Sequence, residues 1–197
     1  MNIEFDDLKH IYKVDGIQKE CVSDILSGLG YKFQSQFVNP VLLENSQLWG
    51  KNFHLVTHLW DLGQLDETSV DPALIPSFEE WIRFKKDYDA EIISSEEKLY
   101  SKRYDFCGTP DKVARIKNQL CILDIKTGDT IDKKKCALQT AAYKILVDEN
   151  SRENVKNRWV IHIPQGGHYK VEPFDYSGDV PGFINGLGWY RYNSRGN

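Results

Sequence analysis

The sequence has no long hydrophobic run, and no segment approaches the roughly 18 consecutive apolar residues that a membrane-spanning helix requires. The first ten residues, MNIEFDDLKH, carry acidic side chains where a secretory signal peptide would carry positive charge. We therefore expect neither a membrane protein nor an exported one, and we expect a cytoplasmic location.

Cysteine is also scarce, and its placement excludes two common uses. No two cysteines have the C-x-x-C spacing of a metal site, and their scatter among apolar residues does not form a disulfide framework. We expect reduced, buried thiols at all four positions, which are Cys21, Cys107, Cys121 and Cys136.

Repeats, low-complexity tracts and long linkers are absent too, so we expect residues 1–197 to form a single domain. Hydrophobic residues make up 41% of the chain and aromatic residues 12%, which is enough for a packed core. The net charge of −4 does not by itself indicate a nucleic-acid binder. Because salt screens charges beyond about 10 Å, a protein with a negative net charge can still have a local basic surface that binds nucleic acid.

The N-terminal segment has the signals of a β-hairpin followed by a short helix. An Asp-Gly dipeptide at 15–16 is favoured in two-residue hairpin turns, and it divides a β-rich segment at about 9–22. Ser23 is expected to cap a short helix that ends near Gly28 or Gly30.

Hydrophobic periodicity predicts helices and strands along the rest of the chain. Ser77 and Glu80 have the spacing of a capping box. Helices are predicted at 45–62, 78–89, 132–149 and from 179 onward. Strands are predicted at 91–100, 104–116, 119–127, 159–164 and 169–174. Strands dominate the middle and helices flank them, so we predict an α/β fold with a central mixed β-sheet flanked by α-helices.

Residues 108–128 place acidic and basic side chains at the end of a strongly apolar strand. Asp124 and Lys126 are two apart, so both leave the same face of a strand. If the preceding hairpin turns at Lys117-Asn118, the paired residue numbers sum to 235, and Asp111 lies opposite Asp124. Two converging carboxylates repel each other unless a cation or a proton lies between them.

A hard divalent cation with oxygen ligands, Mg²⁺ or Mn²⁺, would relieve this repulsion. Such a metal activates water and neutralises charge on a phosphate, and Lys126 would orient the water or stabilise the developing charge. This chemistry fits hydrolysis of a phosphodiester. The alternative is that Asp124 and Lys126 form an ordinary polar pair on a half-buried strand, but charges there are costly unless they are used or paired.

Four motifs stand in the order of a known family. They are Gly50 with His54, G-T-P-D at 108–111, L-D-I-K-T-G at 123–128, and Q-T-A-A-Y at 139–143. In this combination the sequence resembles the PD-(D/E)XK nuclease superfamily and, more narrowly, its RecB-like exonuclease branch, which includes phage and prophage enzymes. The resemblance spans roughly 50–145. It implies a restriction-endonuclease-like core, here at about 45–175, and a bacterial or phage-infected cell as the location.

The resemblance also implies roles for individual residues. Lys126 is similar to the catalytic lysine, and Gln139 and Tyr143 are similar to a pair on the helix after the catalytic hairpin. Some relatives bind an iron–sulfur cluster through one early and three late cysteines; since no cysteine follows Cys136, we expect no such cluster. The resemblance implies four metal ligands, which are His54, Glu96, Asp111 and Asp124. Asp111 and Asp124 are also implied to be catalytic.

Spacing supports several of these assignments independently. Gly50 and His54 lie on one helical face, and a glycine there lets another backbone come close. Alternation along a strand puts only one of Glu96 and Glu97 on the active face, and spacing favours Glu96. His58 follows His54 at the spacing of a zinc pair, but the Glu of an H-E-x-x-H site is absent, so a structural role is favoured.

Basic side chains near the motifs are candidate contacts to nucleic acid, since phosphate contacts give affinity without sequence preference. Lys135 continues a polar stripe with Gln139 and Tyr143, although a solvated helix face explains Lys135 equally well. The candidate contacts are Lys112, Arg115, Lys133, Lys134 and Lys135.

We therefore predict a metal-dependent deoxyribonuclease, most simply an exonuclease of DNA recombination, repair or processing. The expected partner is single- or double-stranded DNA with a free end, with a second copy of the chain or a recombination protein as a further partner. The alternatives are a structure-specific endonuclease of the same fold, an inactive nucleic-acid-binding module, and an unrelated hydrolase with zinc at His54 and His58.

Overall fold

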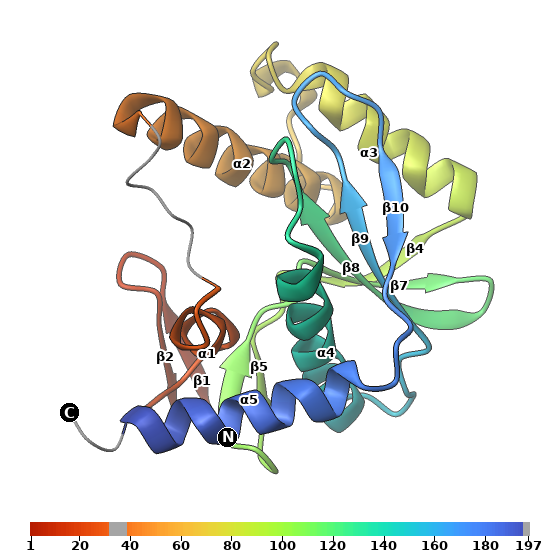
Figure 1. The fold of residues 1–197 in the computed structure, drawn as a ribbon. Helices are drawn as coiled ribbons and strands as arrows, with labels where there is room; N and C mark the ends of the chain where they lie inside the picture. Colours follow the sequence, from red (N-terminus) through yellow and green to blue (C-terminus); the bar gives the residue numbers. More distant parts are fainter. Residues whose placement is uncertain (32–38, 195–197) are drawn as a thin grey trace.

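The centre of the protein is a five-stranded mixed sheet, seen in a computed structural model that describes residues 1–31 and 39–194 (Figure 1). Its strand order is β10-β9-β8-β7-β4, and only β8 and β9 run parallel. The strands are β4 (Glu91–Ser95), β7 (Lys112–Ile116), β8 (Gln119–Lys126), β9 (Asn157–His162) and β10 (Lys170–Pro173).

Helices cover both faces of this sheet, which confirms the predicted α/β architecture. Because both faces are covered, β8 is buried at six consecutive positions, and its apolar residues form a continuous run. One face packs against α1 (Val22–Gly28), α4 (Lys133–Asn150) and α5 (Asp179–Ser194). The other packs against α2 (Pro40–Asp61) and α3 (Ile75–Tyr88), which are joined through the short helix η2 (Glu67–Ser69).

Side-chain alternation along the central hairpin assigns each residue to one of these faces. Leu120 and Ile122 of β8 pack on the α4 side, whereas Leu123 and Ile125 pack on the α2–α3 side. Asp124, two residues after Ile122, therefore belongs to the α4 side of the sheet. Within the described residues, no helix is both long and apolar enough to cross a membrane.

The N-terminus forms a separate small sheet of β1 (Ile3–Asp6), β2 (Ile11–Val14) and β3 (Ile17–Lys19). Its β2–β3 hairpin is the predicted one, and the positive φ angles of Asp15 (49°) and Gly16 (81°) suit a two-residue turn. Strand β1 was not among the predicted strands.

Two predicted strands are interrupted in the structure. The strand predicted at 91–100 stops at Ser95, because Glu96 adopts a left-handed backbone with φ 54°. The strand predicted at 104–116 is broken by Pro110, which has no N–H to donate to a ladder. The pieces beyond these breaks, β5 (Leu99–Ser101) and β6 (Phe106–Gly108), pair with each other in a two-stranded sheet.

Several helix starts differ from the prediction. Helix α1 begins after Cys21, whose N–H donates to the Asp24 carboxylate at 3.3 Å, so Ser23 is not the cap. The Asn39 side chain accepts from the Val41 N–H at 2.9 Å, so α2 begins five residues before the predicted start.

The predicted capping box of α3 is also wrong. The helix starts at Ile75, two residues before Ser77. Ser77 is therefore buried inside the helix, and the carboxylate of Glu80 accepts instead from the Tyr169 N–H at 2.9 Å. Ser77 and Glu80 match a local capping pattern, but in the structure both contact residues that are distant in the sequence.

The register of the β7–β8 hairpin is the predicted one. Its pairs run from Lys112↔Leu123 to Ile116↔Gln119, so the paired numbers sum to 235. Lys117 and Asn118 have φ angles of 50° and 60°, as a two-residue hairpin turn requires. Asp111 precedes the first pair directly, on the level of Asp124.

Gly108 provides a test of how tightly α1 and α4 pack at the end of β6. A Cβ atom there would lie 2.8 Å from both Val22 Cγ2 and Leu146 Cδ1. We expect Gly108→Ala to lower the free energy of unfolding in urea by about 1–3 kcal/mol, the usual cost of overpacking.

Gly188, in the middle of α5, supplies the matched control because a Cβ atom there meets no atom within 4 Å. Gly188→Ala should stabilise the protein by up to about 1 kcal/mol, since alanine favours a helix over glycine. Equal effects of the two substitutions would contradict the close packing at Gly108.

Candidate active site

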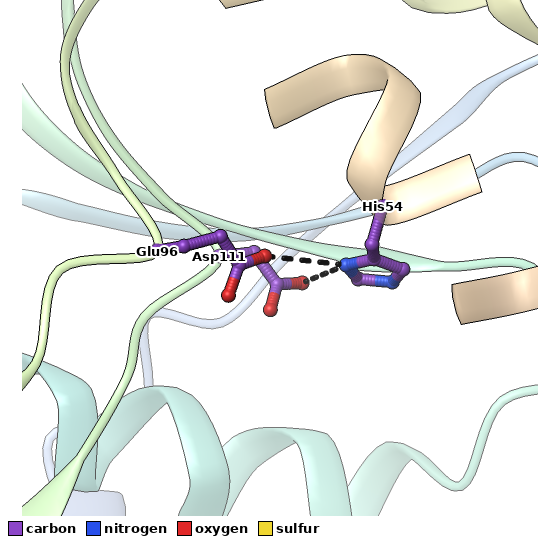
Figure 2. A group of neighbouring side chains, drawn as sticks. All are labelled: His54, Glu96 and Asp111. Carbon is purple, nitrogen blue, oxygen red and sulfur yellow. Dashed lines mark ion pairs between the residues drawn. The ribbon is translucent and has the colours of Figure 1, made fainter. Parts of the chain in front are cut away.

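Three side chains from separate parts of the chain meet at one edge of the sheet (Figure 2). The ligand atoms of His54, Glu96 and Asp111 all lie within 4.8 Å of one another. His54 Nδ1 is 3.7 Å from Glu96 Oε1 and 3.7 Å from Asp111 Oδ2. All three are partly buried, so they form a mixed nitrogen and oxygen donor set that remains open to the surface.

Local structure aims each of these side chains. His54 lies on α2, whose Gly50 faces Thr127 after the end of β8; a Cβ atom at Gly50 would lie 3.1 Å from the Thr127 hydroxyl oxygen. The predicted close approach at Gly50 is thus present, but it is to a side chain. Glu96 is turned by its left-handed backbone, and Asp111 Oδ2 accepts a hydrogen bond from the Ile125 N–H at 2.7 Å.

Asp124 and Lys126 of β8 lie next to this group as an ion pair. Lys126 Nζ is 2.6 Å from Asp124 Oδ2; the Asp124 side chain is fully buried, and that of Lys126 is 28% exposed. Asp124 Oδ1 is buried without a hydrogen-bond partner among the described residues. Of the four predicted metal ligands, His54, Glu96 and Asp111 have ligand atoms within 4.8 Å of one another. Asp124 is not part of this group.

The pKa values in this group follow from burial and mutual charge. Burial raises the pKa of Asp124 to about 6, with Lys126 opposing the rise and Asp111 adding to it. Burial would lower the pKa of His54, but the carboxylates of Asp111 and Glu96 outweigh it and raise that pKa. For Lys126 too, burial is outweighed by Asp124 and Asp111, and the pKa stays above its usual value.

The donor set fits a hard divalent cation. Two carboxylates and one imidazole, with a further buried carboxylate oxygen at Asp124 that has no partner, supply the oxygen-rich ligands that Mg²⁺ and Mn²⁺ prefer. A cation would also offset the mutual repulsion of these carboxylates. Because zinc sites with a second histidine would need His58, it matters that His58 Nδ1 is hydrogen-bonded to Ser95 Oγ at 2.7 Å instead.

A cleft of about 620 Å³ opens above the three ligands. Gln139 and Tyr143 of α4 line it, and Gln139 Nε2 donates to the Tyr143 hydroxyl at 2.9 Å. Tyr12 also lines the cleft and shares a 2.6 Å hydrogen bond with Thr109 Oγ1. Tyr12 was not among the predicted site residues, and only the G-T of the G-T-P-D motif indicated this part of the cleft.

The structure overturns one predicted contact to nucleic acid. Lys112 is fully buried, and its Nζ lies 3.0 Å from Asp61 Oδ2 and 2.8 Å from Ser95 Oγ. Burial lowers the pKa of Lys112, and Asp61 counteracts this. Because Lys112 follows Asp111 on the strand, it points to the opposite face of the sheet, into the α2–α3 core. It cannot reach a phosphate at the surface.

The buried Lys112–Asp61 pair lies next to the candidate ligands, on the other face of the sheet. Asp61 also accepts from Lys85 Nζ at 2.6 Å, which ties α2 to α3. Lys112 is adjacent to Asp111, and Ser95 is adjacent to Glu96, so one network fixes the backbone beneath two of the ligands. No sequence pattern pointed to Asp61 beyond its place at the end of a helix.

The other predicted basic contacts are at the surface. Arg115 lies near the far end of β7 from Asp111, about 13 Å along the strand, and makes two hydrogen bonds to Glu153 at 2.9 and 3.0 Å. Lys133 is 2.8 Å from Glu172 and Lys134 is exposed, both in the first turn of α4 with the half-buried Lys135. Their contact with DNA stays a prediction.

No family model and no curated protein matches the sequence. Among solved structures, the chain is similar to SSO0001, with 12% identity, a TM-score of 0.50, and coverage of 89% of this chain and 76% of that chain. An alkaline exonuclease (LHK-Exo) from Laribacter hongkongensis gives 11% identity, a TM-score of 0.45, and coverage of 90% and 92%. The likeness to SSO0001 concerns the fold alone.

The donor set predicts that a divalent metal stabilises the protein. Mn²⁺ or Mg²⁺ at a hundred times its dissociation constant should add about 2.7 kcal/mol to the free energy of unfolding. Asp111→Asn, which keeps the acceptor for the Ile125 N–H, should remove this gain, whereas Asp175→Asn at the exposed surface should keep it. Thermal unfolding with and without metal measures both.

The same experiment has a defined pH dependence. Protonated His54 cannot bind a metal, and the pKa of His54 is raised by its acidic neighbours, so the metal-dependent gain should disappear as the pH falls through that raised pKa. The metal-free protein should behave oppositely and lose stability at this group as the pH rises through it. A metal gain that does not change with pH would exclude His54 as a ligand.

The buried Lys112–Asp61 pair generates a separate prediction. Asp61→Leu leaves Lys112 with Ser95 alone and should cost about 3–5 kcal/mol of unfolding free energy, the usual effect of breaking a buried pair. The double variant Asp61→Leu, Lys112→Met removes both charges and should recover most of that loss. Urea denaturation measures both, and a double variant no more stable than the single one would show that the pair is not coupled.

Proposed function

We propose that the protein is a metal-dependent nuclease that hydrolyses phosphodiester bonds of DNA, acting as an exonuclease. The observation that carries this proposal is the meeting of His54, Glu96 and Asp111 within 4.8 Å, beside the buried Asp124–Lys126 pair. A group of carboxylates with an amine on the same sheet edge suits the handling of a phosphate, whose charge must be offset while a water molecule attacks. The order of the PD-(D/E)XK-like motifs supports the same conclusion.

Each residue of the group has a role in this proposal. His54, Glu96, Asp111 and Asp124 would hold Mg²⁺ or Mn²⁺, which when bound lowers the pKa of water and neutralises charge on a phosphate. Lys126 stays protonated because Asp124 and Asp111 raise its pKa. Its ammonium can therefore donate to the attacking water or to a phosphate oxygen as negative charge develops.

Gln139 and Tyr143 would position the scissile phosphate from the α4 side. Burial raises the pKa of Tyr143 well above its usual value, so its hydroxyl stays neutral and remains a hydrogen-bond donor. Gln139 directs that hydroxyl through its own Nε2 donor at 2.9 Å. Both line the cleft that contains His54, Glu96 and Asp111, so a phosphate above the ligands would be within the reach of this pair.

The finer assignments depend on the resemblance. The RecB-like branch that the motifs resemble is a branch of exonucleases, and this favours the exonuclease over the endonuclease. A role in recombination or repair of bacterial or phage DNA, and association with a partner protein, follow from the resemblance to the RecB-like branch.

Digestion of end-labelled linear DNA with Mg²⁺ or Mn²⁺, compared with closed circular DNA, tests the proposal. We expect degradation of the linear DNA alone. Cleavage of the circle would show an endonuclease, and no cleavage of either would show a binding module.

Lys126→Ala should reduce cleavage by at least about a hundredfold, because it removes a group that acts in the transition state. Binding of DNA should remain, since Lys126 is not among the side chains that line the cleft. Lys86→Ala, at an exposed position of α3, is the matched control and should cleave as the unmodified protein does. Full activity of the Lys126→Ala protein would remove the lysine from the mechanism.

A further inference from the structure

The wall of the cleft opposite α2 comes from the N-terminal sheet, which has no part in the ligand group. Phe5, Asp7, His10 and Tyr12 of the β1–β2 hairpin line the cleft together with Lys51 and Leu55 of α2. Figure 1 shows α2 above and the β1–β2 hairpin below, with α4 to the right of the hairpin. The cleft that contains His54, Glu96 and Asp111 is thus lined by both elements.

Aromatic rings dominate the hairpin wall. The ring centroids of Phe5 and Tyr12 are 4.4 Å apart, and those of Phe5 and His10 are 5.3 Å apart at an interplanar angle of 85°. Tyr12 is buried, Phe5 is half-buried and His10 is exposed, so the cluster is anchored at its base and open at its outer edge. All three residues line the cleft, and His10 is the most exposed of them.

The outer ring is also held in a fixed orientation. His10 has a left-handed backbone with φ 53°, and its Nε2 shares a hydrogen bond of 2.9 Å with Ser23 Oγ. Asp6 Oδ1 accepts from the N–H groups of Leu8 and Lys9 at 3.1 Å each, which fixes the turn before it. A left-handed non-glycine residue costs free energy that the surrounding contacts must offset, and such residues gather at binding sites.

Two lysines line the same cleft. Lys98 Nζ lies over the Phe5 ring, 5.9 Å from its centroid, and donates to the Glu96 carbonyl oxygen at 3.1 Å. Lys51 of α2 lines the opposite wall. The cleft has three carboxylates, at Asp7, Glu96 and Asp111, so its two lysines do not balance it until a divalent cation binds. With the cation present, the cleft attracts a polyanion.

We propose that the β1–β2 hairpin is a stacking wall for the unpaired bases of single-stranded DNA, and that it selects a single-stranded end for the candidate active site. This inference rests on the proposed function, since it names the substrate of that same site. Ring faces bind bases of any sequence, but only when the bases are not stacked inside a duplex. Lys98 and Lys51, which line the cleft, would hold the phosphates that connect those bases.

The test measures binding of a single-stranded oligodeoxynucleotide with 2-aminopurine near its end, and of a blunt duplex of the same sequence. Both are measured with Mg²⁺ in the Lys126→Ala protein, in which we expect degradation to be at least about a hundredfold slower. His10→Ala removes an exposed ring, and Phe5→Leu keeps apolar bulk against Tyr12 while removing the aromatic face. Tyr192→Leu, an aromatic residue of α5 that is 70% exposed, is the matched control.

We expect 2-aminopurine fluorescence to be quenched on binding. The double variant Phe5→Leu, His10→Ala should weaken single-strand affinity by about tenfold or more, since base–aromatic stacking contributes on that scale. Duplex affinity should change less than twofold, and Tyr192→Leu should change neither. Unchanged single-strand affinity, or an equal loss for single strand and duplex, would overturn the stacking wall. Because His10 is exposed, the single variant His10→Ala decides between the same outcomes if the double variant does not fold.

The outcome is separable from that of the proposed function. If the unmodified protein cleaves no DNA with Mg²⁺ or Mn²⁺ while the oligonucleotide binds as expected, the nuclease fails and the stacking wall stands. If cleavage is present but the hairpin variants bind single strands as tightly as the control does, the nuclease stands and the stacking wall fails.

Discussion

Repulsion between the carboxylates of Glu96 and Asp111, and between Asp111 and the fully buried Asp124, is the constraint on which the site depends. Bringing these carboxylates together costs free energy, because each one loses hydration and none of them stabilises the others. The structure holds them in place through a hydrogen bond to the β8 backbone, a left-handed residue after β4, and the amine of Lys126. A site that is costly to assemble and that offers oxygen ligands is suited to a divalent cation.

The protein places positive charge on both sides of this acidic group. Lys126 stands in front, on the α4 side of the sheet and partly open to the surface, whereas Lys112 stands behind, enclosed with Asp61. In the proposed function Lys126 acts on the substrate, whereas Lys112 ties the segments of Glu96 and Asp111 to α2 and α3. The N-terminal hairpin lines the same cleft from a distant part of the chain.

Some features predicted from the sequence agree with the structure, and others do not. The register of β7 and β8 followed from a two-residue turn and was correct, and the preference for Glu96 over Glu97 agrees with the position of Glu96 beside His54. The physical reason differs from the predicted one. The left-handed backbone of Glu96, which follows β4, directs this side chain toward His54, whereas the prediction relied on alternation along a strand. Lys112 was taken for a surface contact although its adjacency to Asp111 already placed it on the other face. Ser77 and Glu80 matched a local capping pattern, yet tertiary partners use both.

The sequence by itself determined the α/β layering and the central hairpin with its register, and it provided the candidate metal ligands. These properties depend on periodicity and turn chemistry, which act over a few residues. Only the tertiary structure decided which of those residues meet, that Lys112 is buried against Asp61, and that Phe5, His10 and Tyr12 stand over the site. Each of these depends on contacts between segments far apart in the chain, and no local pattern in one sequence encodes such a distance.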